Sequence, residues 1–260
     1  MKQFFFDTAN IESINSIWSK LPKTLDPSNA LGVTTNPNAL NKIGITKVNQ
    51  LKELIEKLAN KISEIRSDDE GIIYIQIPNS NNTIKEIQLW IDQLISIQPH
   101  RARICLKIPP RSDIFHALID LDLDGWQDFD LNITGICDAG TALKCLSYPV
   151  KYVSILAGRM QDAGINLHEQ VDYIQSRAPD DKGIIAGSMR TINGLKDTIA
   201  LGCVPTIGEK IWGLILQDPS FWDTAYAIRE NNNRYCPLIA ETSLSLSEAF
   251  FAQMDLAGQE

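Results

Sequence analysis

Short apolar segments alternate with longer segments of helical periodicity along most of the chain, and this alternation limits the fold more than any other feature. Several apolar segments contain no alternating polar residues, as expected of parallel strands that are covered on both faces. The strand candidates are Gln3–Phe6, Ala30–Val33, Ile72–Ile77, Ile104–Ile108, Leu131–Thr134, Tyr152–Leu156, Ile184–Ala186 and, most weakly, Pro205–Ile207.

Helical patterns fill the intervals between these segments. Asn10 can cap the first helix, and Thr83 and Glu86 can form a capping box in the third. The helix candidates are Ile11–Leu21, Val48–Ile65, Thr83–Ile97, Ser112–Asp120, Ala139–Leu146, Leu167–Ser176, Ile192–Leu201 and Gly208–Leu216. Eight strand–helix units predict an α/β fold, a closed (β/α)8 TIM barrel, with a doubly wound open sheet as the alternative.

The chain length of 260 residues suits one barrel domain, which typically needs about 250 residues. Arg66–Gly71 and Leu121–Asp130 have the composition of loops. We expect a single domain over residues 1–260, with the barrel at about 1–217 and a helical extension at about 218–260. In the extension, Asp218–Ile228 predicts a helix, Glu230–Tyr235 a polar loop and Ser243–Met254 a C-terminal helix. Extra helices of this kind pack over the barrel or against a neighbouring subunit, so we expect a homo-oligomer.

The composition, with 44% hydrophobic and 22% charged residues, is that of a soluble globular protein. A net charge of −8 argues against nucleic acid and against an anionic membrane as partners, because both require basic surface. The five cysteines show no CxxC spacing, which is typical of reduced thiols in a cytoplasmic protein. The apolar stretch at the N-terminus is too short for a signal peptide, and no segment approaches the roughly 18 apolar residues of a membrane span.

Lys107 is the polar residue that the strand pattern explains least. It lies near the end of an apolar strand, before Pro109 and Pro110. Burial disfavours the ammonium form and lowers the pKa of a lysine, and a neutral amine is the nucleophile that attacks a carbonyl. The alternative is a lysine whose ammonium group extends from the strand end into solvent.

Other polar residues lie at the same ends of the remaining strands, where TIM barrels carry their active sites. Singly, each is a cap, a turn or a solvated loop residue: Asp7 could cap a helix, and Pro37 suggests a turn. Gln76, in an otherwise apolar strand, requires hydrogen-bond partners. Together they predict a polar pocket with a phosphate site after the sixth and seventh strands. The candidates are Asp7, Thr35, Asn36, Gln76, Asn132, Thr134, Ser154, Arg159, Ser188 and Arg190.

From Phe4 to about Leu216, the chain resembles the transaldolase family, including its small fructose-6-phosphate aldolase branch. The resemblance lies in Phe5–Asn10, in Gly-Val-Thr-Thr-Asn-Pro (Gly32–Pro37) and in the Leu-Lys-Ile-Pro segment around Lys107. Tyr152–Ser154 with Gly158–Arg159, and Ala186–Arg190, resemble the motifs on the phosphate side.

The resemblance implies a (β/α)8 barrel and a Schiff base on Lys107, without a metal or organic cofactor. It implies that Asp7 is an acid/base residue and that Thr134 holds the catalytic water. Asn36 would contact a substrate hydroxyl or orient the lysine, and Asn132 would contact the substrate. Ser188, Arg159 and Arg190 would bind the phosphate. The implied activity is transfer of a dihydroxyacetone unit between sugar phosphates.

Two positions depart from the family pattern. Transaldolases carry a glutamate at the position of Gln76, whereas the aldolase branch carries a glutamine there, as this chain does. Leu156 stands where the aldolase branch carries a tyrosine and transaldolases a phenylalanine. Transfer and reversible aldol cleavage therefore both stay open, as does a catalytically weakened protein that only binds sugar phosphates. A sugar-phosphate isomerase, with Asp7 as base and Lys107 unmodified, is a further alternative.

Overall fold

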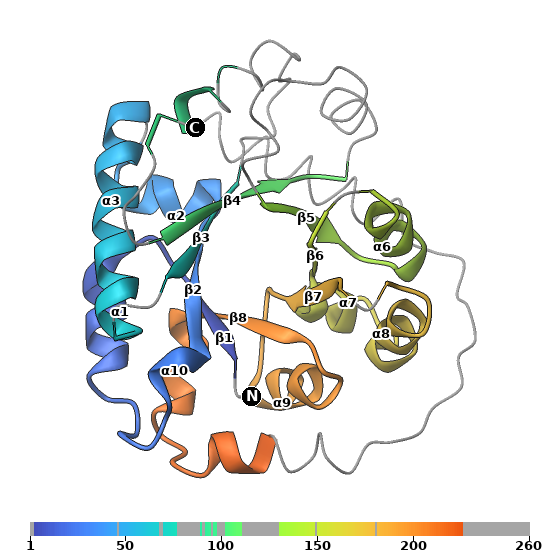
Figure 1. Ribbon diagram of the computed structural model, residues 1–260. Helices are drawn as coiled ribbons and strands as arrows, with labels where there is room; N and C mark the ends of the chain where they lie inside the picture. The colour runs from blue at the N-terminus through green and yellow to red at the C-terminus, as the bar shows by residue number, and fades with distance from the viewer. Residues whose placement is uncertain are drawn as a thin grey trace.

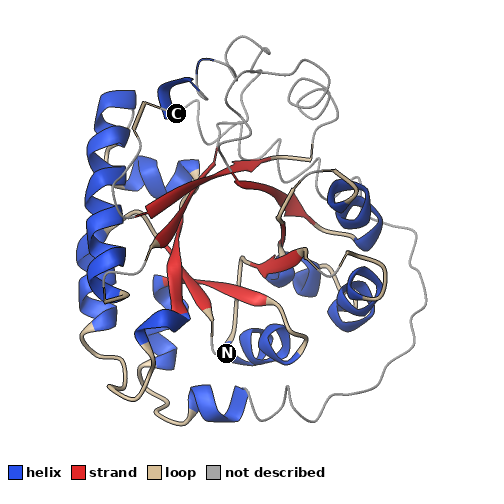
Figure 2. Ribbon diagram, in the orientation of Figure 1, coloured by secondary structure: helices blue, strands red, loops and turns tan. Residues whose placement is uncertain are grey.

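The computed structural model describes residues 3–45, 47–67, 70–76, 89, 92–94, 96–97, 102–110, 130–148, 150–179 and 181–225. Eight parallel strands form a closed barrel in chain order, with helices around the outside (Figure 1; Figure 2). The strands are β1 (Phe4–Asp7), β2 (Ala30–Thr34), β3 (Gly71–Gln76), β4 (Ala102–Ile108), β5 (Asp130–Ile136), β6 (Tyr152–Ile155), β7 (Gly183–Ala186) and β8 (Val204–Gly208). The (β/α)8 barrel is confirmed, and the open sheet is excluded.

The described helices follow the strands and cover the barrel. They are α1 (Ile11–Trp18), the 3-10 helix η1 (Pro27–Asn29), α2 (Pro37–Lys42), α3 (Val48–Ile65), α6 (Ala139–Leu146), α7 (Ala157–Asp162), α8 (Leu167–Gln175), α9 (Ile192–Ala200) and α10 (Glu209–Ile215). Residues 221–225 are also helical. The predicted cap at Asn10 is confirmed, since its side chain accepts from the backbone N–H groups of Glu12 and Ser13.

Two short helices, α2 and α7, were not predicted. The turn expected at Pro37 is wrong, because Pro37 is the first residue of α2 and Asn36 caps that helix by accepting from Ala39 N at 2.9 Å. Proline suits this position since its missing N–H would have no partner within the helix. Leu156, expected in β6, is instead the residue that precedes α7.

Several predictions lie wholly or mostly outside the described residues. They are the helices Thr83–Ile97 and Ser112–Asp120, the loop Leu121–Asp130, and the extension beyond residue 225. The single domain over residues 1–260 and the homo-oligomer stay predictions.

Strand alternation builds two separate cores. Phe4 and Phe6 face outward and pack against Trp212 of α10, with ring centroids 5.1 and 5.5 Å apart. Phe5, between them, faces inward and joins a cluster with Tyr74, Cys105 and Ile185 inside the barrel. Because the two faces of β1 meet different apolar surfaces, all three phenylalanines are fully buried.

The barrel positions polar groups two residues beyond this inner cluster. Gln76, Lys107 and Asn132 are register partners on β3, β4 and β5. Asp7 on β1 is the partner of Thr34 on β2 and of Gly208 on β8. Hence the carboxyl ends of neighbouring strands bring these side chains together.

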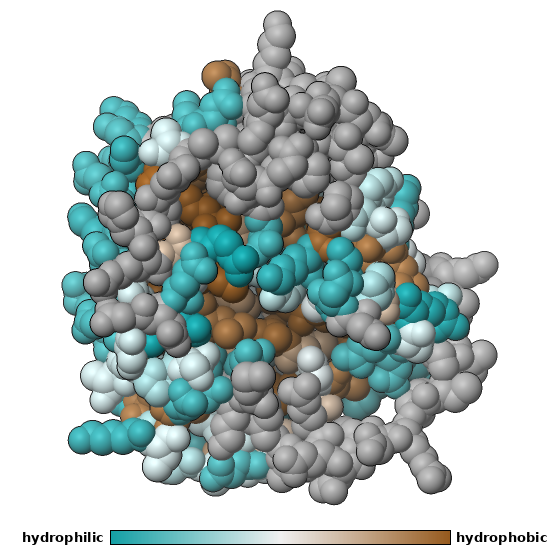
Figure 3. Space-filling view, viewed as in Figure 1, coloured by the Kyte–Doolittle hydropathy of each residue, from teal (hydrophilic) through white to brown (hydrophobic). Residues whose placement is uncertain are grey.

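The surface of the molecule also carries both hydrophobic and hydrophilic residues. Figure 3 shows hydrophobic residues gathered toward the middle of one face, with hydrophilic residues among them and along its edge. Among the described helices, none is both long and apolar enough to span a bilayer.

Candidate active site

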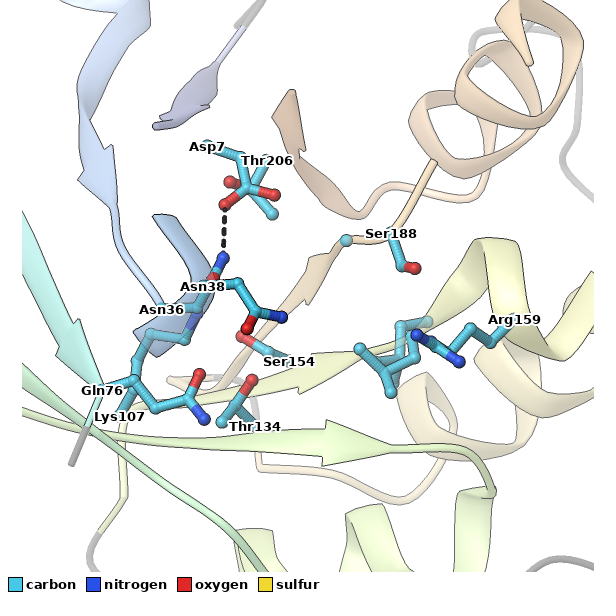
Figure 4. Close-up of a pocket in the computed structure, with 13 residues that line it drawn as sticks. Asp7, Asn36, Asn38, Gln76, Lys107, Thr134, Ser154, Arg159, Ser188 and Thr206 are labelled. Atoms are coloured by element: carbon cyan, nitrogen blue, oxygen red, sulfur yellow. Dashed lines mark hydrogen bonds between the residues drawn. The ribbon is translucent and has the colours of Figure 1, made fainter. Parts of the chain in front are cut away.

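A cavity of about 180 Å³ opens at the carboxyl ends of the strands. It brings together residues from β1, β3, β4, β5, β6 and β8 and from the segments that follow β2, β6 and β7 (Figure 4). Eight of the site residues expected from the sequence line it, namely Asp7, Asn36, Gln76, Lys107, Thr134, Ser154, Arg159 and Ser188.

Lys107 lies inside the barrel with only 7% of its surface exposed. Its Nζ donates to the backbone carbonyl of Thr35 at 3.1 Å, and no described carboxylate lies within 4.0 Å of it. Burial is the largest influence on its pKa and lowers it, while the charges of Asp7 and Cys105 act in the opposite direction. The amine therefore has a larger neutral, nucleophilic fraction than an exposed lysine.

Asp7 faces the same cavity from β1. Its Oδ1 accepts from Thr34 Oγ1 at 3.2 Å and from Asn36 Nδ2 at 3.5 Å, the contact drawn in Figure 4. Burial raises the pKa of Asp7, while the charge of Lys107 and the two hydrogen bonds oppose that rise. A carboxylate with a raised pKa is a stronger base than an exposed one, which suits a group that takes up a proton.

Two buried amides flank Lys107. Gln76 is 4% exposed and Asn132 is fully buried, and the amide nitrogens of both have no hydrogen-bond partner among the described residues. The Asn132 Oδ1 accepts from Ser154 Oγ at 2.9 Å, which orients its amide. Buried donors of this kind normally bind water or a ligand. The Gln76 amide and the Thr134 hydroxyl face each other across the cavity floor (Figure 4).

Arg159 and Ser188 form another wall of the cavity, away from Lys107 (Figure 4). Helix α7, which carries Arg159, packs tightly against the segment that carries Ser188, since a Cβ on Gly158 would come within 1.8 Å of the Ser188 carbonyl oxygen. Ser188 itself has a φ of 63°, an unusual conformation for a residue with a side chain. Burial lowers the pKa of Arg159, and the charge of Arg190 lowers it further. Two neighbouring guanidinium groups favour an anion between them.

Three of the expected residues do not line the cavity. Thr35 is buried and donates its hydroxyl to the Tyr74 carbonyl at 3.0 Å. Asn132 lies behind Ser154, and Arg190 is exposed and pairs with Asp162 at 3.1 Å. Their assignment to substrate binding stays a prediction.

The sequence analysis missed two polar lining residues, Asn38 and Thr206. Asn38 follows Pro37, in the segment expected to be a turn. Thr206 lies in the weakest predicted strand, where strand periodicity from Val204 would have placed it on the inner face. Among the described residues, no group of three or more acidic, cysteine or histidine side chains could hold a metal ion.

Comparison with known proteins agrees with this arrangement. A sequence model described as transaldolase/fructose-6-phosphate aldolase matches residues 4–247. The chain belongs to this family. The match extends beyond the barrel into the C-terminal segment, so family membership applies to nearly the whole chain.

Individual relatives from the transaldolase/fructose-6-phosphate aldolase family are distant. A protein of Clostridium tetani named probable transaldolase is 29% identical over 225 residues, which cover 84% of this chain and 91% of that protein. One from Sinorhizobium medicae with the same name is 27% identical over 203 residues, which cover 77% and 82%. Among solved structures, a dihydrodipicolinate synthase family protein from Coccidioides immitis has a TM-score of 0.51 and 12% identity, covering 99% of this chain and 94% of that one. This likeness supports the fold alone.

Proposed function

We propose that this family member is a Schiff-base-forming transaldolase, which transfers a dihydroxyacetone unit between sugar phosphates. The observation that supports this most directly is the Lys107 amine. It is buried in the barrel cavity and hydrogen-bonded to a neutral carbonyl rather than to a described carboxylate. A lysine of this kind is suited to attack the ketone of a ketose phosphate.

The proposed reaction uses Lys107 as the electron sink. Its neutral amine adds to the ketone carbon, and the hydroxyl of the resulting carbinolamine takes up a proton and leaves as water, which gives a protonated imine. Asp7 takes the proton from the C4 hydroxyl, the C3–C4 bond breaks, and its electron pair moves to the imine as an enamine. An aldehyde phosphate departs. The enamine then attacks a second aldehyde, and hydrolysis of the new imine regenerates the amine. The protonated imine stabilises the developing charge, so we expect no metal or organic cofactor.

The phosphate end of the substrate would lie at Arg159 and Ser188. Arg159 has a partly buried guanidinium in the cavity wall, and Ser188 lies beside it. Arg190 would add charge at longer range, since it lowers the pKa of Arg159 and is therefore close to it. Charge-assisted hydrogen bonds from guanidinium groups suit a phosphate.

Reversible aldol cleavage is a second candidate, and Gln76 favours it. An amide cannot exchange protons as a carboxyl group does, and the buried Gln76 donor would hold a water together with Thr134, which lines the same cavity. Leu156 lines the cavity but cannot donate a proton to the enamine. We therefore expect slow turnover in either reaction, limited by proton transfer.

The test is incubation with fructose 6-phosphate, with and without erythrose 4-phosphate, and, in separate samples with fructose 6-phosphate, addition of borohydride. Transfer yields sedoheptulose 7-phosphate only when both sugars are present, whereas cleavage yields glyceraldehyde 3-phosphate from the first alone. Borohydride should fix an adduct on the peptide that contains Lys107, and the Lys107→Met variant should show none. Turnover without an adduct on that peptide would indicate an isomerase or another mechanism. Binding without any product would identify a sugar-phosphate-binding protein.

A further inference from the structure

Two buried hydroxyls connect Asp7 to a part of the cavity that the proposed mechanism leaves unused. Thr34 Oγ1 lies 3.2 Å from Asp7 Oδ1 and 2.5 Å from Thr206 Oγ1. Thr34 is 1% exposed and does not line the cavity, whereas Thr206 is 6% exposed and does. The contacts join three neighbouring strands, since β1 pairs with β2 on one side and with β8 on the other.

The Thr206 methyl group lies close to Gly187, where a built Cβ would come within 3.1 Å of it. The Thr206 hydroxyl contacts the Thr34 hydroxyl. Thr206 and Asp7, which overlap in the view of Figure 4, both contact Thr34 Oγ1.

The direction of these hydrogen bonds depends on the protonation of Asp7. Each hydroxyl has one proton to donate. When Asp7 is ionised, Thr34 donates to it and Thr206 donates to Thr34. When Asp7 is protonated, it can donate to Thr34, which then donates to Thr206, and the Thr206 proton points into the cavity.

We infer that Thr34 and Thr206 form a proton relay that positions Asp7 and returns its proton to the cavity; this rests on the proposed function. After Asp7 has taken the C4 hydroxyl proton, it passes a proton to Thr34 oxygen. Thr34 passes its own proton to Thr206, and Thr206 passes its own to a water or substrate oxygen in the cavity. Three O–H bonds break and three form, and Asp7 is again a carboxylate.

The charged groups near Asp7 determine how the relay responds to pH. They are Lys107 from β4 and Lys42 from α2, both of which favour its ionised form. Glu209 of α10 is held by Thr8, the residue that follows Asp7, because its carboxylate accepts from Thr8 Oγ1 at 2.9 Å. Asn36 donates to Asp7 but cannot take up a proton. Removing the Thr34 hydroxyl should therefore raise the pKa of Asp7 and move the acid limb of the rate profile to higher pH.

The test compares Thr34→Val and Thr206→Val with the wild type in initial-rate kinetics across pH. Both variants should lower kcat roughly threefold to tenfold with little change in KM, and both should move the acid limb in the same direction. Thr34→Ser and Thr206→Ser, which keep the hydroxyls, should restore the wild-type profile. Thr198→Val is the matched control, because Thr198 is fully buried and donates to Leu195 O at 2.8 Å on α9.

Borohydride trapping on Lys107 separates the possible failures. Variants that trap normally retain a folded site, so their kinetics bear on the relay alone. If both valine variants keep the Thr198→Val rates and pH profile, the relay is wrong. If only Thr206→Val acts, and through KM, Thr206 is a substrate contact instead. A wild type that is never trapped overturns the proposed function, and the relay with it.

Discussion

The barrel interior contains two layers that are built from the same strands and have opposite chemistry. Phe5, Tyr74, Cys105 and Ile185 form an apolar lower layer. Two residues further along the chain, Asp7, Gln76, Lys107 and Gly187 line the cavity and form the upper layer. A β-strand returns to the same face every second residue, so β1, β3 and β4 each supply one packing residue to the lower layer and one polar residue to the cavity.

Burial, a single physical effect, has two outcomes in these layers. Burial lowers the pKa of Lys107 and raises the pKa of Cys105 well above its usual value. Both groups therefore favour their neutral forms. A neutral amine is nucleophilic, whereas a neutral thiol is unreactive. Position along β4, rather than the degree of burial, separates the two roles, because only Lys107 reaches the cavity.

The largest expected effect comes from removing the amine of the upper layer. Lys107→Met should reduce turnover at least about 10³-fold, since Lys107 is the one lysine among the described residues that line the cavity. Its matched control is Cys105→Ala, two residues earlier on β4, which should keep activity within about twofold and lose about 1 kcal/mol of stability. Steady-state rates and denaturant unfolding measure the two properties. Comparable activity losses in both variants would show that the layers are not functionally distinct.

The second prediction adds a proton donor to the upper layer. Leu156→Tyr should raise the rate of aldol cleavage roughly 10²-fold, because a positioned acid/base typically contributes at least that much. Leu156→Phe adds the same ring without a hydroxyl and should not raise it. Gln76→Glu should instead favour transfer. Initial rates of both reactions provide the measurement, and an equal gain from the phenylalanine variant would attribute the effect to packing.

The third prediction concerns the proposed phosphate site at Arg159 and Ser188. Arg159→Ala should weaken phosphorylated substrates roughly 10- to 100-fold, since a charge-assisted hydrogen bond contributes about 1.5–3 kcal/mol. Arg190→Ala should cost less, roughly threefold, because Arg190 is exposed and already paired with Asp162. KM values for phosphorylated and unphosphorylated sugars measure the difference. An equal loss for both kinds of sugar would make the arginines structural.

The smallest predicted effect is on stability above pH 9, where the two layers should act with opposite signs. The folded pKa of Lys107 lies below the ordinary 10.5, so between these values the unfolded chain binds more protons and stability rises with pH. The folded pKa of Cys105 lies above the ordinary 9.0, so stability falls above pH 9. Each contributes at most about 1.4 kcal/mol per pH unit.

Unfolding free energies measured from pH 8 to pH 11 check these signs. Against the wild type, Lys107→Met should remove a stabilising slope and Cys105→Ala a destabilising one. Slopes that both variants leave unchanged would mean that neither group has a shifted pKa in the folded protein.

The sequence alone determined the fold class and the identity of the central residues. Eight apolar segments in alternation with helical periods require a parallel sheet covered on both faces, and the polar residue at each strand end follows from local periodicity. For this reason Lys107, Asp7 and Gln76 could be assigned to one pocket before any coordinates. Helices α2 and α7 were missed because each is only six residues long, too short for a periodic signal.

Only the tertiary structure decided which of these candidates reach the cavity. The sequence pattern does not distinguish Thr35, Asn132 and Arg190 from the residues that line the cavity. In the folded protein they contact, respectively, the Tyr74 carbonyl, the Ser154 hydroxyl and the Asp162 carboxylate, and they do not line the cavity. The Thr34–Thr206 pair, 172 positions apart, exists because the barrel closes β8 against β1. Periodicity gives the face on which a side chain lies, but a contact across the barrel depends on closure and on the packing of every strand between.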